Sequence, residues 1–400
     1  MNKNKLAKGI YWVGAVDWDV RDFHGYSTYR GSTYNSFLVI DEKVTLFDTV
    51  KHSHMDQLLY NIGKIIDPKE IDYIVVNHVE LDHSGSLPKM MEIVQPEKLI
   101  CSPMGEKALI AHFHREDWPY HIVKSGDEIS LGARTVQFLE TRMLHWPDSM
   151  FSYLQEDGIL FTSDAFGQHL ASTERFDDEL ELDEIMQESA KYYANILNLF
   201  SPLIRKLLRT IKEMDLDLKI IAPDHGLIWR SHQDKILAAY EKWSNQEHSN
   251  RALIIYDSMW HSTEEMAKSI SIGLEEEGVP AELINMQVHH RSDVVTKVLD
   301  ARALILGSPT LNNGILPRMA GLLSYMKGLK PARKLGAAFG SYGWSGEAVA
   351  QLNTIMDEMK IERINDGLRL KYVPTEESLD QCREYGRELG RSILASEEGK

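Results

Sequence analysis

The stretch His78-Val79-Glu80-Leu81-Asp82-His83 places four potential metal ligands within six residues. It directly follows the apolar run Tyr73–Val76, which has the composition of a buried strand. The carboxylate of Glu80 is a harder donor than an imidazole and adds negative charge, which suits iron better than catalytic zinc. This stretch therefore predicts a metal site at the end of a strand, with iron as the favoured metal.

Three more potential ligands follow predicted strands elsewhere in the first 250 residues. His145 follows an expected strand at 134–140, Asp164 follows one at 158–162, and His225 follows one at 219–222. An αββα sandwich delivers such strand ends to one rim, so we expect two ions there. The predicted ligands are His78, Glu80 and His145 for one ion, Asp82, His83 and His225 for the second, and Asp164 as a bridge.

A lone histidine at a strand end is usually an ordinary surface or core histidine. Four such positions in order, together with the His-x-Glu-x-Asp-His run, favour metal binding instead. Three carboxylates would stabilise a ferric pair through their charge. The sequence leaves open whether His83 or a water completes the second site. It favours His169 as a neighbour of the ligands rather than a ligand.

Length and composition limit the remaining possibilities. The chain has 400 residues, which favours two domains, and a formal charge of −16, which argues against a nucleic-acid or anionic-membrane partner. Its two cysteines, Cys101 and Cys382, lie too far apart in sequence for a cysteine-rich cluster and indicate a reducing cytoplasm. No apolar run approaches the ~18 residues of a membrane helix.

The pattern of apolar residues changes near the polar segment 241–250, where we place the domain boundary. Residues 1–248 read as short strands with a few helices, expected at 53–66, at 183–213 with a break near Ser201-Pro202, and at 232–245. Residues 251–395 instead alternate regularly between strands and helices. This alternation is typical of an open parallel sheet with helices on both faces.

Three loops at the carboxyl ends of the expected parallel strands have the composition of a flavin site. The first, 257–264, is rich in hydroxyls and opens a helix, so it can bind a phosphate without Lys or Arg. The absence of a Gly-x-Gly pattern favours a mononucleotide, and Trp260, Tyr342 and Trp344 are placed to flank a flavin ring. The predicted FMN contacts are Ser258, Met259, Trp260, His261, Ser262, Thr263, Pro309, Thr310, Leu311, Asn312, Asn313, Gly314, Ser341, Tyr342, Gly343, Trp344, Ser345 and Gly346.

Taken together, these motifs resemble those of the flavodiiron proteins. The resemblance rests on the 78–83 run, the block 145–149, Asp164 and the segment 223–226, and it covers nearly the whole chain. Zinc hydrolases of the metallo-β-lactamase class carry a histidine where this chain has Glu80. The resemblance implies an N-terminal metallo-β-lactamase-like αββα sandwich, 1–248, and a C-terminal flavodoxin-like doubly wound five-stranded parallel sheet, 251–395.

The resemblance also implies an activity and partners. It implies reduction of O2 to water or of NO to N2O by FMN and a diiron centre with an oxo or hydroxo bridge. It implies rubredoxin as the electron donor, external here because the sequence has no Cys-x-x-Cys pair, and head-to-tail homodimers in which the FMN of one subunit lies beside the irons of the other. His24, Tyr26 and Tyr193 are candidates for the wall of the gas pocket and for proton donors.

Two other functions compete with this hypothesis. A zinc-dependent hydrolase would explain the first domain but neither Glu80 nor the flavodoxin-like half. An electron carrier or sensor with an inactive metal site conflicts with the complete ligand set. The sequence leaves open the choice between O2 and NO, the donor's identity, and dimer versus tetramer.

Overall fold

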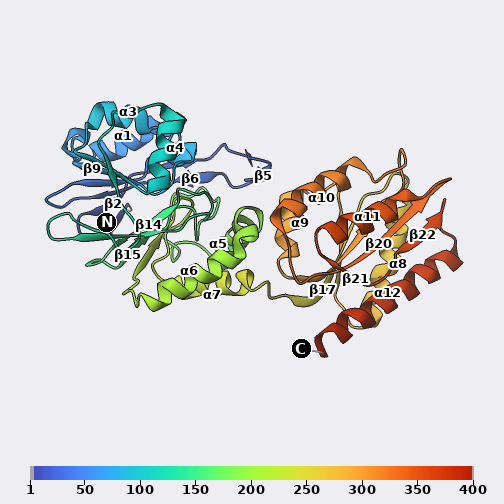
Figure 1. The fold of residues 1–400 in the computed structure, drawn as a ribbon. Coiled ribbons are helices and arrows are strands. Elements are labelled where there is room, and N and C mark those ends of the chain that lie inside the picture. Colours follow the sequence, from blue (N-terminus) through green and yellow to red (C-terminus); the bar gives the residue numbers. More distant parts are fainter. Residues whose placement is uncertain (1–3, 399–400) are drawn as a thin grey trace. The chain divides into compact units, whose positions relative to one another are not determined.

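The computed structural model describes residues 4–398, which divide into two compact units. The first contains the residues up to Tyr193 together with Phe200–Ser244. The second contains Ala194–Leu199 and the residues from Asn245 onward. Figure 1 shows mixed sheets and helices in the first unit, and one sheet flanked by helices in the second.

Two sheets form the centre of the first unit. The larger sheet has the strand order β1-β2-β7-β8-β9-β10-β11, and the smaller β12-β13-β14-β15-β16. The larger comprises β1 (Lys5–Ala7), β2 (Ile10–Trp12), β7 (Phe37–Val39), β8 (Thr45–Phe47), β9 (Tyr73–Val76), β10 (Lys98–Cys101) and β11 (Tyr120–Ile122). The smaller comprises β12 (Glu128–Ser130), β13 (Thr135–Glu140), β14 (Met150–Leu154), β15 (Ile159–Phe161) and β16 (Ile220–Ala222).

The alternation of side chains along each strand makes two separate cores. Phe47 of the larger sheet stacks on Phe161 of the smaller at a centroid distance of 4.3 Å, in the core between the sheets. The preceding residue of β8, Leu46, points the other way into a core with the flanking helices. These helices are α1 (Met55–Gly63), α3 (Leu87–Val94) and α4 (Pro103–Phe113).

Further helices complete the αββα arrangement that the sequence predicts. The expected helix at 183–213 is α5 (Leu182–Tyr192) and α6 (Ser201–Glu213), separated by a π turn at Tyr193–Leu197 and a 3-10 turn at Asn198–Phe200. Pro202 lies in the first turn of α6, where its missing N–H costs nothing. Phe166 joins Phe151 of β14 to Tyr240 of α7 (Gln233–Ser244) through ring contacts.

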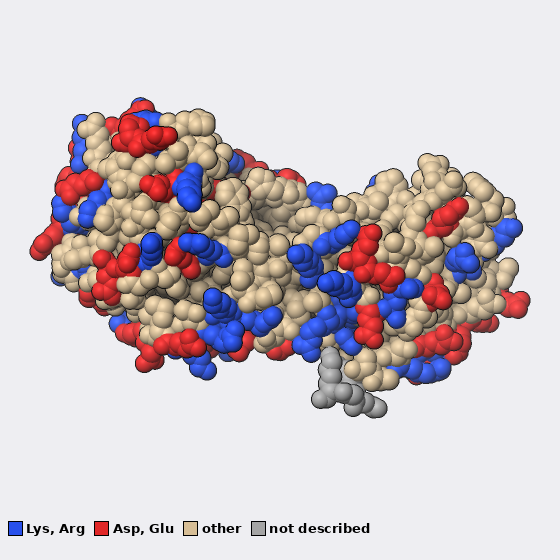
Figure 2. All heavy atoms as spheres, viewed as in Figure 1, with Lys and Arg blue, Asp and Glu red and all other residues tan. Residues whose placement is uncertain are grey.

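Shorter elements complete this unit. They are β3 (Ala15–Asp17) paired with β6 (Ser32–Tyr34), β4 (Asp22–Phe23) paired with β5 (Tyr26–Ser27), the short helix α2 (Leu81–Ser84), and 3-10 turns at His52–His54 and Pro68–Glu70. On the face drawn in Figure 2, acidic and basic side chains are interspersed over this unit.

The second unit is a parallel sheet with helices on both faces. Its strands are β18 (Ala281–Asn285), β17 (Ser249–Tyr256), β19 (Ala301–Gly307), β20 (Leu335–Tyr342), β21 (Glu362–Arg363) and β22 (Leu368–Lys371). Its helices are α8 (Ser262–Glu276), α9 (Arg291–Val298), α10 (Pro317–Leu329), α11 (Glu347–Glu358) and α12 (Glu376–Glu398).

The doubly wound architecture agrees with the sequence prediction, except at one edge. The predicted sheet has five strands, but β21 and β22 share the fifth position and both pair with β20. Gly367 separates them with φ +91°, a backbone conformation that interrupts an extended strand. Among residues 4–398, no helix combines the length and the apolar character that crossing a bilayer requires.

Candidate metal centre and flavin site

Four strand ends supply the predicted ligands at one rim of the sandwich. His78 and Glu80 follow β9, and Glu80 precedes the single-turn helix α2, which carries Asp82 and His83. The remaining three, His145, Asp164 and His225, follow β13, β15 and β16. Ends of neighbouring strands meet at one edge, so residues up to about 150 positions apart in sequence become neighbours.

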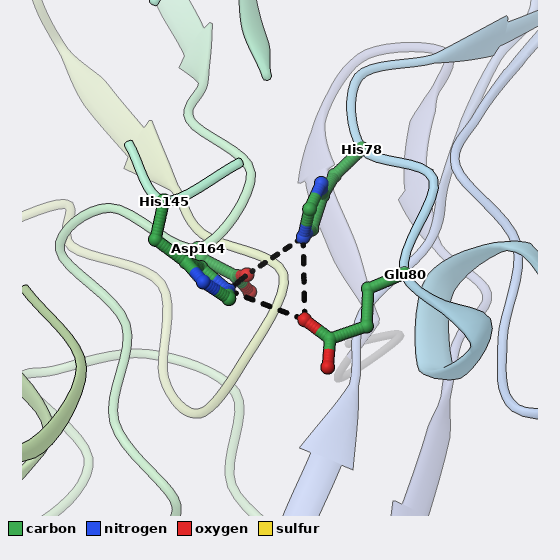
Figure 3. Close-up of side chains that lie close together, drawn as sticks. All are labelled: His78, Glu80, His145 and Asp164. Carbon is green, nitrogen blue, oxygen red and sulfur yellow. Dashed lines mark hydrogen bonds and ion pairs between the residues drawn. The ribbon is translucent and has the colours of Figure 1, made fainter. Parts of the chain in front are cut away.

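The first group consists of His78, Glu80, His145 and Asp164, whose donor atoms converge (Figure 3). His145 Nε2 lies 2.8 Å from Asp164 Oδ2 and 3.3 Å from Glu80 Oε2. His78 Nε2 lies 3.4 Å from each of the same two carboxylate oxygens. Two imidazoles and two carboxylates therefore face a common point.

The second group consists of Asp82, His83 and His225. His83 Nε2 lies 3.1 Å from His225 Nε2, and Asp82 Oδ2 lies 3.2 Å from the former and 3.1 Å from the latter. Asp164 faces this group through its other oxygen: Oδ1 is 3.2 Å from His83 Nε2 and 3.4 Å from His225 Nε2. The two oxygens of Asp164 thus serve the two groups separately, as a bridging carboxylate would.

These atoms fit a pair of metal ions better than a network of hydrogen bonds. His78 Nε2, Asp164 Oδ1 and both oxygens of Asp82 are buried without a hydrogen-bond partner in the described part of the chain. Ligands ~2.1 Å from one ion and at right angles to each other lie about 3.0 Å apart. The observed separations bracket this value. Imidazole and carboxylate donors without thiolate suit iron.

Electrostatics inside the cluster favour added positive charge. Burial alone raises the pKa of Asp164, but the positive charge of His83 and a hydrogen bond from His145 outweigh it and hold that pKa well below its usual range. Burial lowers the pKa of His145, yet its bonds to Asp164 and Glu80 raise it to about 9. Protons on the histidines thus balance the carboxylates, and a metal ion would displace them.

Buried acceptors fix the orientation of two imidazoles. His78 Nδ1 lies 2.9 Å from Asp148 Oδ2, which also accepts from the backbone N–H of Val79 at 2.7 Å. His225 Nδ1 lies 2.6 Å from the carbonyl oxygen of Thr33. In each case the Nδ1–H donates outward, which directs Nε2 toward the cluster, where it would bind a metal ion that displaces its proton.

We expect Asp148→Asn to weaken metal retention by about 10- to 100-fold, because an amide leaves the tautomer of His78 unspecified. The measurement is iron remaining per chain after dialysis against graded chelator. Asp117→Asn, at an exposed aspartate paired with Arg115, is the control that should retain iron. If Asp148→Asn retains as much iron as wild type, Asp148 does not orient His78 for metal binding.

His83 and the segment 223–226 show how the second group is held. His83 Nδ1 lies 3.7 Å from Asp224 Oδ2, beyond hydrogen-bond distance, while its Nε2 faces the cluster. Gly226 has φ +79°, and a Cβ at this position would collide with the side chain of Gln168. Glycine therefore permits the sharp turn that directs His225 inward.

The predicted pocket residues have three different environments. His24 Nε2 lies 3.1 Å from Glu80 Oε1, although the side chain is 76% exposed. The ring of Tyr26 is buried against His169, at a centroid distance of 5.1 Å. Tyr193, by contrast, faces away: its hydroxyl lies 2.8 Å from Ser201 Oγ, and its ring contacts α7.

The prediction of Tyr193 as a pocket residue therefore needs correction, because its neighbour Tyr192 has that place. Tyr192 is buried, with its ring 5.0 Å from that of His169 and 6.0 Å from that of His225. Adjacent helical residues point about 100° apart, so only one of the pair can face the cluster. Nothing in the sequence around α5 indicates which of these two tyrosines faces the donor groups.

His169 lies beside the second group rather than in it. Its Nδ1 is 2.8 Å from Ser32 Oγ, and its ring is 4.6 Å from that of His225. Burial and the nearby charge of His225 hold its pKa well below the usual range, so the ring is neutral. Neither convergent group of donors includes it.

In the second unit, a cavity of about 440 Å³ opens at the carboxyl ends of the strands. Of the predicted FMN contacts, it is lined by Ser258, Met259, Trp260, Ser262, Pro309, Thr310, Leu311, Asn312, Ser341, Tyr342, Gly343 and Trp344. The other six predicted contacts, His261, Thr263, Asn313, Gly314, Ser345 and Gly346, do not line it.

The cavity has the features that a flavin mononucleotide requires. Helix α8 begins at Ser262, so its free N–H groups face the cavity, and Ser258 Oγ is buried without a hydrogen-bond partner among residues 4–398. Thr263 Oγ1 instead bonds to Ser341 Oγ at 3.0 Å, which ties two of the loops together. Tyr372 and Val373 add a fourth wall that the sequence analysis missed, because the broken edge strand β22 gave no strand signal.

Comparisons with known proteins agree with the fold of both units. A family model described as "ODP family beta lactamase" matches residues 33–226, and one described as "Flavodoxin" matches 254–386. The chain is 44% identical to rubredoxin-oxygen oxidoreductase of Megalodesulfovibrio gigas, over 99% of each chain. It is 46% identical to nitric oxide reductase of Moorella thermoacetica, over 97% of this chain and 98% of that one.

A solved structure is also closely similar. The flavodiiron protein from Giardia intestinalis superimposes with a TM-score of 0.95 at 35% identity, covering 98% of this chain and 97% of that one. The chain belongs to the flavodiiron protein family. It is an oxidoreductase whose flavodoxin-type unit takes FMN and whose lactamase-like unit takes a diiron centre.

Proposed function

We propose that this protein reduces O2 to water, NO to N2O, or both, with electrons that pass from a rubredoxin-type donor through FMN to a diiron centre. One observation carries the proposal: the two donor groups share Asp164, one oxygen each, in a chain that also has a flavin cavity. Two ions held by these two groups would supply electrons to one gas molecule or to a pair at once. The relatives' names point to the same two substrates and to rubredoxin.

The chain's own residues hold the ions and govern proton supply. Three carboxylates and four imidazoles supply the ligands, and Asp148 with the carbonyl of Thr33 orients two of those rings. Both gas reductions consume protons. His24, exposed to solvent yet 3.1 Å from Glu80 Oε1, is placed to carry a proton from water to the edge of the first group.

The zinc-hydrolase alternative is rejected. It leaves the flavodoxin-type unit without a purpose, and the relatives with this lactamase-like fold are named as oxidoreductases over the full length of the chain. The reading as an electron carrier with an inactive metal site is disfavoured because the donor atoms of all seven predicted ligands converge.

The assembly and the location belong to the proposal too. We propose a head-to-tail homodimer or a tetramer built from such dimers, in which the FMN of one subunit serves the irons of another. A cytoplasmic location is supported by two cysteines that are free and buried. We propose the domain limits 1–248 and 251–395; the two compact units divide slightly earlier in the chain, between Ser244 and Asn245.

The test is gas consumption by iron- and FMN-loaded protein that is reduced anaerobically, by rubredoxin or chemically, and then given O2 or NO in parallel assays. Fast turnover of one gas and slow, self-inactivating turnover of the other would establish the class and the substrate. The same protein loaded with zinc is the control, and it should consume no NO and only the O2 that reduced flavin removes by itself. If the iron form consumes no more than this control despite full reduction, the proposal fails.

Trp344→Ala should slow electron flow from flavin to iron while both cofactors stay bound. The side chain lines the cavity yet is 86% exposed, so it contributes little to burying the flavin within its own chain. We expect about a tenfold slower iron reduction in stopped-flow absorbance, and Trp344→Phe should preserve the rate. Loss of FMN in the alanine variant would instead assign Trp344 to binding alone.

A further inference from the structure

The hairpin segment, residues 18–31, forms part of the wall of the metal centre. It contains β4 and β5, and the ring of Phe23 lies 5.1 Å from that of His169 and 6.1 Å from that of His225. The next residue, His24, brings Nε2 to 3.1 Å from Glu80 Oε1. The hairpin segment therefore contacts ligands of both donor groups, and its position determines where His24 lies.

The strand pairing within the hairpin segment is short. Its two strands have two residues each, and isolated hairpins even longer than this are marginal in water. His24 adopts φ +56°, a conformation that side chains other than glycine adopt at a cost. Arg30 forms ion pairs with Glu184 and Glu188 of α5, but its side chain is 44% exposed, and exposed pairs contribute little.

A buried lysine from α5 supplies a stronger attachment. Lys191 is only 6% exposed, and its Nζ donates to Ser27 Oγ at 2.9 Å. The same ammonium lies over the ring of Tyr29, 4.3 Å from its centroid, and 5.4 Å from that of Tyr26. All three partners belong to the hairpin segment. A cation taken out of water gains most from such aromatic faces and a hydroxyl acceptor.

The same turn of α5 also contacts the metal centre directly. Tyr192, next to Lys191, lies 5.0 Å from His169 and 6.0 Å from His225 by ring centroids. The turn that follows is a π turn, at Tyr193–Leu197. Such turns change the direction of successive side chains and often occur at functional sites. The C-terminal end of α5 thus contacts the hairpin segment through Lys191 and lies beside the predicted ligand His225 through Tyr192.

We propose that Lys191 is a positioning residue: it fixes the hairpin segment against α5 and thereby keeps His24 within hydrogen-bond distance of Glu80. The structural part of this inference stands alone, whereas its effect on turnover rests on the proposed reductase function. The residue acts through the hairpin segment and touches neither substrate nor ligand.

The test compares Lys191→Met, which keeps length but removes charge, with wild-type protein loaded with iron and FMN. We expect hydrogen–deuterium exchange of amides 18–31 to rise about tenfold, since the contacts of Lys191 limit how often the hairpin segment opens locally. Gas turnover should fall about threefold or more with iron content unchanged. The matched control is Lys64→Met, which removes a surface ammonium 3.9 Å from the ring of Tyr60, on α1. It should leave both readouts as in wild type.

A second pair of variants covers the case in which Lys191→Met does not fold. Tyr29 is 58% exposed, so replacing it carries little risk to the core. Tyr29→Leu should increase exchange of the hairpin segment, and Tyr29→Phe, which keeps the aromatic face, should restore protection. Wild-type exchange of residues 18–31 in Lys191→Met or, where that variant does not fold, in Tyr29→Leu would overturn the proposal. If wild-type protein consumes no gas but the exchange results hold, the reductase function fails and the positioning role survives.

Discussion

Asp164→Asn is expected to abolish binding of both irons and to lower turnover by at least about 100-fold. The reason is that one carboxylate serves both groups: Oδ2 lies 2.8 Å from His145 Nε2, and Oδ1 lies 3.2 Å from His83 Nε2. An amide offers one oxygen instead of two and no charge. The remaining imidazoles would then face each other without the shared anion.

The measurement for Asp164→Asn is iron per chain, by elemental analysis after reconstitution, together with gas consumption. Asp177→Asn is the control, because Asp177 is equally buried in the same unit but accepts from the backbone N–H groups of residues 230–232. The control should lose stability and keep both irons. An Asp164→Asn protein that retains two irons would show that the bridge is not required for binding.

Glu80→His should weaken iron retention and turnover together, and shift metal preference toward zinc. Glu80 brings a hard, charged oxygen to within 3.3 Å of His145 Nε2, and its second oxygen faces His24. An imidazole in its place removes one negative charge from the first group and the acceptor for His24. We expect the iron-to-zinc ratio after competitive loading to fall about tenfold.

The control for Glu80→His is Glu92→His, at an exposed glutamate of α3 that pairs with Lys89. It should bind iron as wild type does. Unchanged iron content and rate in Glu80→His would refute the role of the carboxylate. A variant that keeps its iron but loses turnover would instead assign Glu80 to proton transfer with His24.

The sequence predicts the layers of the fold well and their edges poorly. Short, mostly apolar runs identified β9, β13, β15 and β16, and with them the rim where the ligands lie. Pro202 predicted the break between α5 and α6, since it lacks the N–H that a helix interior needs. The edge strands β21 and β22 escaped notice because two- and four-residue strands carry almost no periodic signal.

The choice between Tyr192 and Tyr193 shows where prediction from sequence stopped. Both are buried aromatic residues in the same helical run, and the rotation of the helix alone puts one beside His225 and the other against α7. Likewise, nothing in the segment 145–149 marks Asp148 as the acceptor for His78, seventy positions earlier. Such pairings depend on how the sheets stack.

The sequence by itself determined the chemistry of the site: hard carboxylates among imidazoles at strand ends, and hydroxyl-rich loops that precede helices. These properties are local, because donor type and strand or helix pattern depend on neighbouring residues. Only the tertiary structure decided that Asp164 divides its two oxygens between two groups, that Tyr372 and Val373 complete the flavin cavity, and that Lys191 holds the wall near His24. Side-chain direction and the meeting of distant segments follow from the packing of whole layers, and short-range sequence patterns do not encode that packing.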